Sequence, residues 1–215
     1  MEQVQGGPRV PVATTPGLSG LVRLRTGSSY RVDESSIALA LLAEPSRAGS
    51  WVAVVGVADL GVEAAAEHGL NLDRTVLVPD PAGHWPEVAA ALVDVAPLVW
   101  LRTTGTVRRP VASRLTARLR KRSATLLVQG DWPGSEAHLR IAGSQWYGAE
   151  DGHGRLRSRL VTVECVRGSA PARTTQLWLP AEPERDATGI RPRDGARDEQ
   201  ARPTDRPPAR LEAVG

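Results

Sequence analysis

The chain has 215 residues, of which 41% are hydrophobic, and a formal net charge of +3. This length suits one domain with an appendage, and the small basic excess permits contact with nucleic acid without demanding it. Cys165 is the only cysteine, which excludes an intramolecular disulfide, and no run approaches the ~18 apolar residues of a membrane span. We therefore expect a cytoplasmic protein that makes no membrane contact.

The first quarter of the chain predicts few regular elements. Residues 1–19 are rich in Gly, Pro, Ser and Thr, which predicts a flexible N-terminal arm. Leu21–Leu24 is a candidate for a short strand, and Thr26–Ser36 is expected to form a polar turn. Ile37–Ala43 predicts a buried helix that ends at Pro45.

Strands and helices then alternate. Buried strands are predicted at Trp51–Val57, Thr75–Val78, Leu98–Leu101 and Thr125–Gln129, with helices at Ala58–His68, from Pro86 to Val95, and at Val111–Arg122. Strand–helix–strand repetition of this kind is typical of a parallel sheet with right-handed crossovers.

The pattern changes after Gly130. His138–Ala142, Arg159–Val166 and Thr175–Leu179 predict strands without intervening helices, which suits an antiparallel extension at the sheet edge. The segment 181–215 is mostly Pro, Arg, Asp and Glu, and we expect it to be a disordered polar tail because it has too few apolar residues to offset its ordering entropy.

The order of these segments resembles the ATPase core of the recombinase RecA. Ile37–Leu42 resembles the helix after its phosphate loop, and Gly49–Gly56 the strand that follows. Ala66–Val78 and Ala112–Gln129 resemble two later helix-to-strand segments, the second of which ends near the DNA-binding loops. The resemblance implies a RecA-like three-layer α/β domain over residues 20–180, with a mainly parallel central sheet.

Three stretches are similar to the ImuA family, specifically its actinobacterial ImuA′ branch: Leu39–Gly56, Gly152–Arg159 and Thr174–Pro180. The resemblance implies a non-catalytic accessory protein of error-prone translesion synthesis in the SOS response to DNA damage. It also implies binding to an ImuB-like homologue of Y-family polymerases and, indirectly, action with an error-prone C-family DNA polymerase. RecA and DNA are further candidate partners, and the nucleoid is the expected location after damage.

The chain lacks the residues of a nucleotide site. A phosphate loop requires G-x-x-x-x-G-K-[ST], yet the chain contains no Gly-Lys pair. Asp33 and Glu34 fall where a phosphate would sit, and we expect them to repel an anion and to stabilise the helix N-terminus. The strand Leu98–Leu101 leads into Arg102 instead of an Asp that would hold Mg²⁺. These features predict a protein with no cofactor, no metal and no enzymatic activity.

One helix carries the candidate nucleic-acid residues. They are Arg108, Arg109, Arg114, Arg118, Lys121 and Arg122. Within the helix, Arg114, Arg118 and Lys121 share one face, and cations of this kind contact phosphates without sequence preference. A solvated face in an arginine-rich protein is the equally weighted alternative.

Candidate partner-binding residues lie in two segments. The first is the turn around Gly152–Arg155, where His153, Arg155 and Arg157 are candidates, although a plain loop is the simpler interpretation. The second is the tail, in which Leu211 and Val214 are among the few apolar side chains that an interface could bury.

Two other functions remain open at this point. One is a SulA-like inhibitor of cell division, which is also a RecA-related domain without a phosphate loop. The other is a RecA-like, DNA-dependent ATPase with a cryptic nucleotide site. The missing Lys and Asp argue against the ATPase, and the polar tail argues against the SulA-like protein.

Overall fold

The segments predicted as strands assemble into one central sheet. The computed structural model describes residues 8–150 and 153–180. The sheet has eight strands in the order β10-β9-β8-β3-β7-β6-β4-β5. Their bounds are β3 Ser28–Val32, β4 Val52–Val55, β5 Thr75–Val78, β6 Leu98–Arg102, β7 Thr125–Gln129, β8 Ala137–Glu150, β9 His153–Val166 and β10 Arg173–Leu179.

The predicted α/β class, with a mainly parallel sheet and an antiparallel extension at one edge, is confirmed. β3, β4, β5, β6, β7 and β8 are mutually parallel. β9 runs antiparallel to both of its neighbours, β8 and β10. The connections from β3 to β4, β4 to β5, β5 to β6 and β6 to β7 contain the predicted helices, whereas residues 130–136 join β7 to β8 without one.

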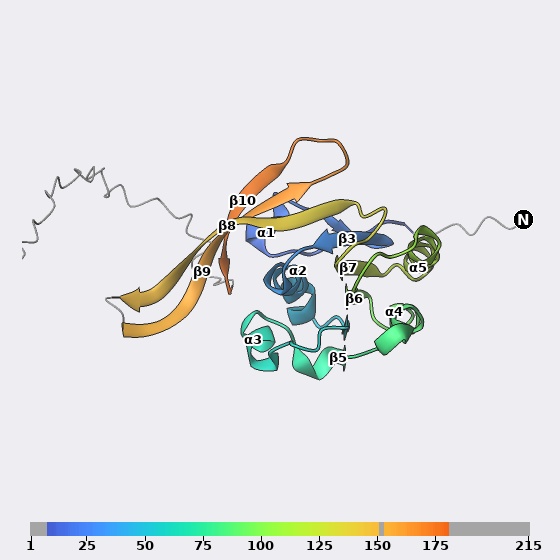
Figure 1. Cartoon of the computed structure of the whole chain (residues 1–215), viewed down its shortest axis with the longest axis horizontal. Coiled ribbons are helices and arrows are strands. Elements are labelled where there is room, and N and C mark those ends of the chain that lie inside the picture. Colours follow the sequence, from blue (N-terminus) through green and yellow to red (C-terminus); the bar gives the residue numbers. More distant parts are fainter. Residues whose placement is uncertain (1–7, 151–152, 181–215) are drawn as a thin grey trace, which may run out of the picture.

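Helices cover the parallel part of the sheet on both faces, as Figure 1 shows. They are α1 Pro16–Ser19, α2 Ser35–Arg47 and α3 Val62–Glu67 on one side, and α4 Trp85–Val93 and α5 Arg109–Arg122 on the other. Alternate residues of β6 enter the two cores: Trp100 packs in the cluster that contains α2, and Val99 packs with α4 and α5. This alternation produces the three layers.

Strand β3 is the main difference from the sequence-based expectation. The polar turn predicted over Thr26–Ser36 is wrong at Ser28–Val32, which is a central strand between β7 and β8. Ser28 and Ser29 are only 2% and 3% exposed, and Tyr30 is 1% exposed. Small hydroxyl side chains fit a covered strand, so the hydropathy pattern alone did not reveal it.

The N-terminal segment is also more structured than a flexible arm. Residues 1–7 lie outside the described residues, but β1 (Pro11–Val12) pairs antiparallel with β2 (Leu24–Arg25). Leu18 of α1 is fully buried in the core. The expected arm therefore does not extend over 11–19, because burial of Leu18 anchors this segment to the domain. The predicted tail, 181–215, lies outside the described residues.

Helix α2 does not end at Pro45 as expected, but continues to Arg47. Pro45 is buried, so its ring contributes to the core at the last turn of the helix, where a lost backbone hydrogen bond costs least. The connection 56–61 replaces the end of the strand predicted over Trp51–Val57 and the start of the helix predicted over Ala58–His68.

The antiparallel extension is longer than predicted. β8 and β9 have 14 residues each and form a hairpin that projects from the domain in Figure 1. β3 pairs with only Ala137–Leu139 of β8, and β10 pairs with only Arg159–Cys165 of β9. The remainder of the hairpin is therefore a two-stranded ribbon.

We expect the α2-side core to depend on Trp100, which is fully buried. Replacing it with Ala should lower the free energy of unfolding by about 3–5 kcal/mol, because the lost contacts leave a large cavity. The matched control is Trp51→Ala, since Trp51 is 45% exposed and its removal should cost far less. Urea unfolding followed by circular dichroism measures both, and equal losses would contradict this picture of the core.

Candidate functional site

A cleft of about 610 Å³ lies where the parallel strands end and α2 begins. In open α/β sheets this edge is where ligands usually bind. Its lining comes from α2, from the turns after β3 and β4, from the ends of α3, β6 and β7, and from the antiparallel extension. The lining residues are Asp33, Glu34, Ser35, Ser36, Asp59, Glu67, His68, Arg102, Gln129, Trp146, Arg159, Leu179 and Pro180.

The connection between β3 and α2 is too short to wrap a phosphate. β3 ends at Val32 and α2 begins at Ser35, so only Asp33 and Glu34 lie between them. The Asp33 N–H donates to the Leu139 carbonyl at 3.1 Å, which ties the turn to β8. A phosphate loop needs several consecutive amides that face the ligand, and this turn has no length for them.

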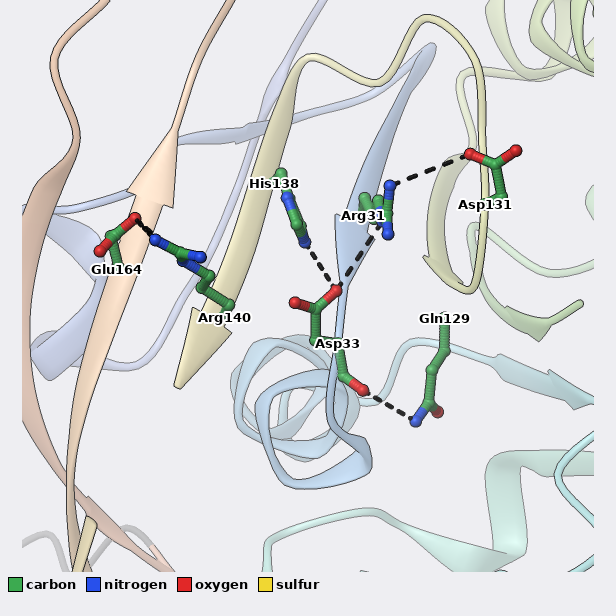
Figure 2. A network of polar contacts seen from close by, with 7 residues as sticks. All are labelled: Arg31, Asp33, Gln129, Asp131, His138, Arg140 and Glu164. Carbon is green, nitrogen blue, oxygen red and sulfur yellow. Dashed lines mark hydrogen bonds and ion pairs between the residues drawn. The ribbon is translucent and has the colours of Figure 1, made fainter. Parts of the chain in front are cut away.

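Both carboxylates lie at the start of α2, as predicted, but cations hold them. Glu34 is the N-cap residue, and its side chain makes no capping hydrogen bond. Its Oε2 instead accepts from Nη2 of Arg159 at 3.0 Å. Figure 2 shows Asp33 between two strands: its Oδ1 lies 2.6 Å from Nε2 of His138 and 3.8 Å from Nε of Arg31. These partners leave neither carboxylate available as a direct cap.

Arg102 occupies the position where the sequence comparison expected a magnesium-binding Asp. It extends from the end of β6, and its Nη2 donates to Oγ of Ser35 at 2.9 Å. Its Nε donates to Oε1 of Gln129 at 3.1 Å, and its Nη1 pairs with Asp59. The hydrogen bond from Arg102 lowers the pKa of the Asp59 carboxyl.

Glycine allows the backbone to approach Arg102 closely. Gly56 follows β4 with φ +76°, and a Cβ at this position would lie 2.6 Å from the Arg102 carbonyl oxygen. Any other residue would therefore be strained and would push β4 and β6 apart at this edge.

Arg159 forms a second cationic contact with α2. It reaches from β9, and its Nη2 donates to Oγ of Ser36 at 3.0 Å in addition to Glu34. Its guanidinium also stacks 5.3 Å from the ring centroid of Trp146. A cation near a helix N-terminus is unfavourable against the helix dipole, so the carboxylates of Glu34 and Asp59 are what make these two positions stable.

The described residues contain no group of three or more His, Cys, Asp or Glu side chains that could hold a metal ion. His68 lines the cleft, but its Nδ1 lies 2.8 Å from the Ala64 carbonyl oxygen of its own helical turn. Cys165 is a free cysteine and is 3% exposed within β9.

The predicted nucleic-acid face lies on α5, and all six of its candidate residues are exposed. Leu115 and Leu119 are buried beneath it, as the helical spacing predicted. Asp94, at the end of α4, accepts hydrogen bonds from both Arg118 and Arg122, and these bonds lower the pKa of its carboxyl. Part of the face is thus neutralised, and DNA contact through α5 stays a prediction.

Partner binding by the predicted residues stays a prediction. His153, Arg155 and Arg157 belong to the outer part of β9, on the projecting hairpin, and their side chains are outside the described set. Leu211 and Val214 lie outside the described residues altogether.

Sequence reasoning missed most of the contacts in the cleft. The sequence indicated that Arg102 stands where an Asp would hold Mg²⁺, but it predicted no contact for Arg102. For Arg159 it predicted a place in a strand and no contact either. Their hydrogen-bond partners are 27 to 125 residues away in the sequence. The one local signal was the arginine directly after a buried strand, a position that faces the carboxyl edge of a parallel sheet.

We expect Arg102 to stabilise the domain through Ser35 and Gln129. Arg102→Met keeps the aliphatic stem and should lower the free energy of unfolding by about 1–2 kcal/mol, because two polar groups lose a charged partner. Arg114→Met, at an exposed position with no ion pair among the described residues, is the matched control.

The effect of Arg102→Met should depend on pH. Because Arg102 lowers the folded-state pKa of Asp59, its contribution is present above the ordinary carboxyl pKa and is lost as the pH falls through the folded-state value. Urea unfolding at neutral and acidic pH tests this. A difference between wild type and variant that grows as the pH falls would contradict it.

No helix in the described part of the chain is both long enough and apolar enough to cross a membrane.

Comparison with known proteins identifies a family and a relative. A family model described as the MT3502 N-terminal domain matches residues 17–134, from α1 to the turn after β7. The "Uncharacterized protein Rv3395c" of Mycobacterium tuberculosis (strain ATCC 25618 / H37Rv) is 38% identical over 148 residues, which are 64% of this chain and 68% of that protein. The matched region includes the shortened β3–α2 turn and Arg102. The chain belongs to the MT3502 N-terminal domain family.

Proposed function

We propose that this chain is a non-catalytic, RecA-like accessory protein of error-prone translesion DNA synthesis, and that it binds an ImuB-like homologue of Y-family polymerases. In this proposal it acts in the cytoplasm and at the nucleoid after DNA damage, with an error-prone C-family polymerase as an indirect partner. The pathway rests on the resemblance of Leu39–Gly56 and Thr174–Pro180 to the ImuA′ branch.

One observation carries the non-catalytic part of the proposal. At the edge where a RecA-like ATPase would hold nucleotide, Asp33 and Glu34 alone connect β3 to α2, and Arg102 binds Ser35 at the start of the helix. An incoming triphosphate would face two carboxylates, and the hydroxyl that a P-loop offers to Mg²⁺ is already a hydrogen-bond acceptor. The cleft is thus built around internal ion pairs.

The three-layer architecture and its antiparallel extension also fit the RecA resemblance. Without a nucleotide to bridge neighbouring subunits, an ATP-dependent homopolymer is not expected. The surface of the domain is then free for recognition of a different protein.

We expect Mg-ATP not to bind. Calorimetry at submillimolar nucleotide should give no saturable heat, and 1 mM Mg-ATP should leave the melting temperature unchanged, because a ligand that binds the folded state stabilises it by mass action. Heat of dilution into buffer is the control. A one-to-one isotherm would instead support the cryptic ATPase.

We expect the ImuB-like protein to be retained in a pull-down by the full chain. Removal of residues 181–215, which include Leu211 and Val214, should weaken retention, because charged and apolar side chains of this segment would be lost from the interface. A second variant, with His153, Arg155 and Arg157 changed to Ala, tests the hairpin. Full retention by the truncated chain would place the contact on residues 1–180, and no retention by the full chain would contradict the proposed partner.

A further inference from the structure

A second cleft, of about 540 Å³, lies at the opposite end of the sheet from the α2 N-terminus. It forms where β2 leads into β3, where β8 begins, and where β9 ends and β10 begins. Four arginines line it: Arg23, Arg25, Arg167 and Arg173. All four are exposed, and they come from segments up to 150 residues apart. We call the cleft that these four residues line the arginine cleft.

The arginine cleft contains almost no negative charge that could balance its four arginines. Glu136 is the one carboxylate that lines it, and this group is already engaged twice. Its Oε2 accepts from the Tyr30 hydroxyl at 2.9 Å, and its Oε1 lies 2.6 Å from Nη1 of Arg9. Within residues 8–150 and 153–180, none of the four cleft arginines forms an ion pair.

The floor of the cleft fixes the backbone that carries two of the arginines. The Tyr30 hydroxyl accepts the Arg25 N–H at 2.8 Å and lies 3.3 Å from the Arg23 carbonyl oxygen. Burial, followed by the charge of Glu136, raises the pKa of the Tyr30 phenol, so this group remains a hydrogen-bond donor to Glu136. The backbone positions from which the two arginine side chains extend are therefore set before any ligand arrives.

We infer that the arginine cleft binds the phosphate backbone of a nucleic acid. Guanidinium groups match phosphate oxygens in a two-pronged geometry, and several of them in one groove can contact successive phosphates. The lining includes no exposed aromatic or large aliphatic side chain, because Tyr30 and Leu21 are 1% and 3% exposed. The contact would therefore be to the backbone, without base stacking or sequence preference.

The same absence of apolar lining argues against other polyanions. An acidic peptide partner usually needs a buried aromatic or aliphatic anchor at the centre of its interface, and a membrane surface needs apolar side chains that insert. This inference concerns a different edge of the sheet from the proposed nucleotide-free cleft, and it does not depend on the identity of the protein partner.

The arginine cleft is also a better candidate than the outward face of α5. Two cations of that face, Arg118 and Arg122, are held by the Asp94 carboxylate. Among the described residues no carboxylate pairs with a cleft arginine, and the guanidinium of Arg173 donates to the Gly20 carbonyl at 2.9 Å. The turn between β2 and β3, which begins beside Arg25, also lies against α5, since a Cβ at Gly27 would lie 3.3 Å from Cα of Arg120. A test must therefore separate the two surfaces.

The test compares two triple variants of the full chain with equal change in charge. The cleft variant is Arg23→Ala, Arg25→Ala and Arg167→Ala, and the control is Arg109→Ala, Arg114→Ala and Lys121→Ala. All six side chains are exposed, so both proteins should keep the wild-type melting temperature. Fluorescence anisotropy with a labelled single-stranded oligonucleotide, at several salt concentrations, measures affinity and its salt dependence.

We expect the wild type and the α5 control to bind with a slope of log K against log salt of about −3, as four phosphate contacts would give. The cleft variant should bind at least ten-fold more weakly, with a slope smaller in magnitude by about 2. Equal losses in both variants, or a loss only in the α5 control, would overturn the inference. So would poly-glutamate or anionic vesicles that compete as well as unlabelled oligonucleotide.

Discussion

Arg102 connects more of this fold than any neighbouring side chain in the described cleft. Its guanidinium reaches from the end of β6 to α2, to Gln129 of β7 and to Asp59 after β4. Three strands and one helix N-terminus therefore share a single charge at the edge where an α/β domain usually places its ligand. The Ser35 hydroxyl that Arg102 reaches lies directly after the turn of two residues, Asp33 and Glu34, that joins β3 to α2.

The parallel part of the fold could be predicted because its strands are continuous apolar runs. β5 and β7 have the bounds that their sequences indicate, and β6 extends beyond its apolar run by one residue, Arg102. β3 could not be recognised in this way, since Ser28, Ser29 and Arg31 give it a polar composition although its neighbours cover it on both edges. Its burial is decided by β7 and β8, about 100 residues later in the chain.

The sequence predicted which nucleotide-binding residues are missing from the candidate site, but it predicted few of the contacts that the cleft contains. The missing Lys of the phosphate loop and the missing Asp after the strand Leu98–Leu101 can be read directly from the sequence. The loss of nucleotide chemistry could therefore be predicted without the structure. The pairing of Glu34 with Arg159 joins α2 to an antiparallel strand, and no local pattern encodes it. The helix spacing of Arg114, Arg118 and Lys121 was correct, but the neutralising role of Asp94 depends on how α4 and α5 pack.

The two ends of the sheet differ in whether their arginines have carboxylate partners. At the carboxyl edge, Arg102 and Arg159 face Asp59 and Glu34, so attraction within the protein satisfies them. At the amino edge, the acid that lines the arginine cleft is already held by Tyr30 and Arg9, and the four arginines repel one another across the groove. Unbalanced charge of this kind destabilises the folded state slightly and attracts anions strongly. Under our two proposals, a domain that neutralises the edge where a RecA-like ATPase holds nucleotide, and leaves the opposite edge cationic, contacts a polyanion without hydrolysing one.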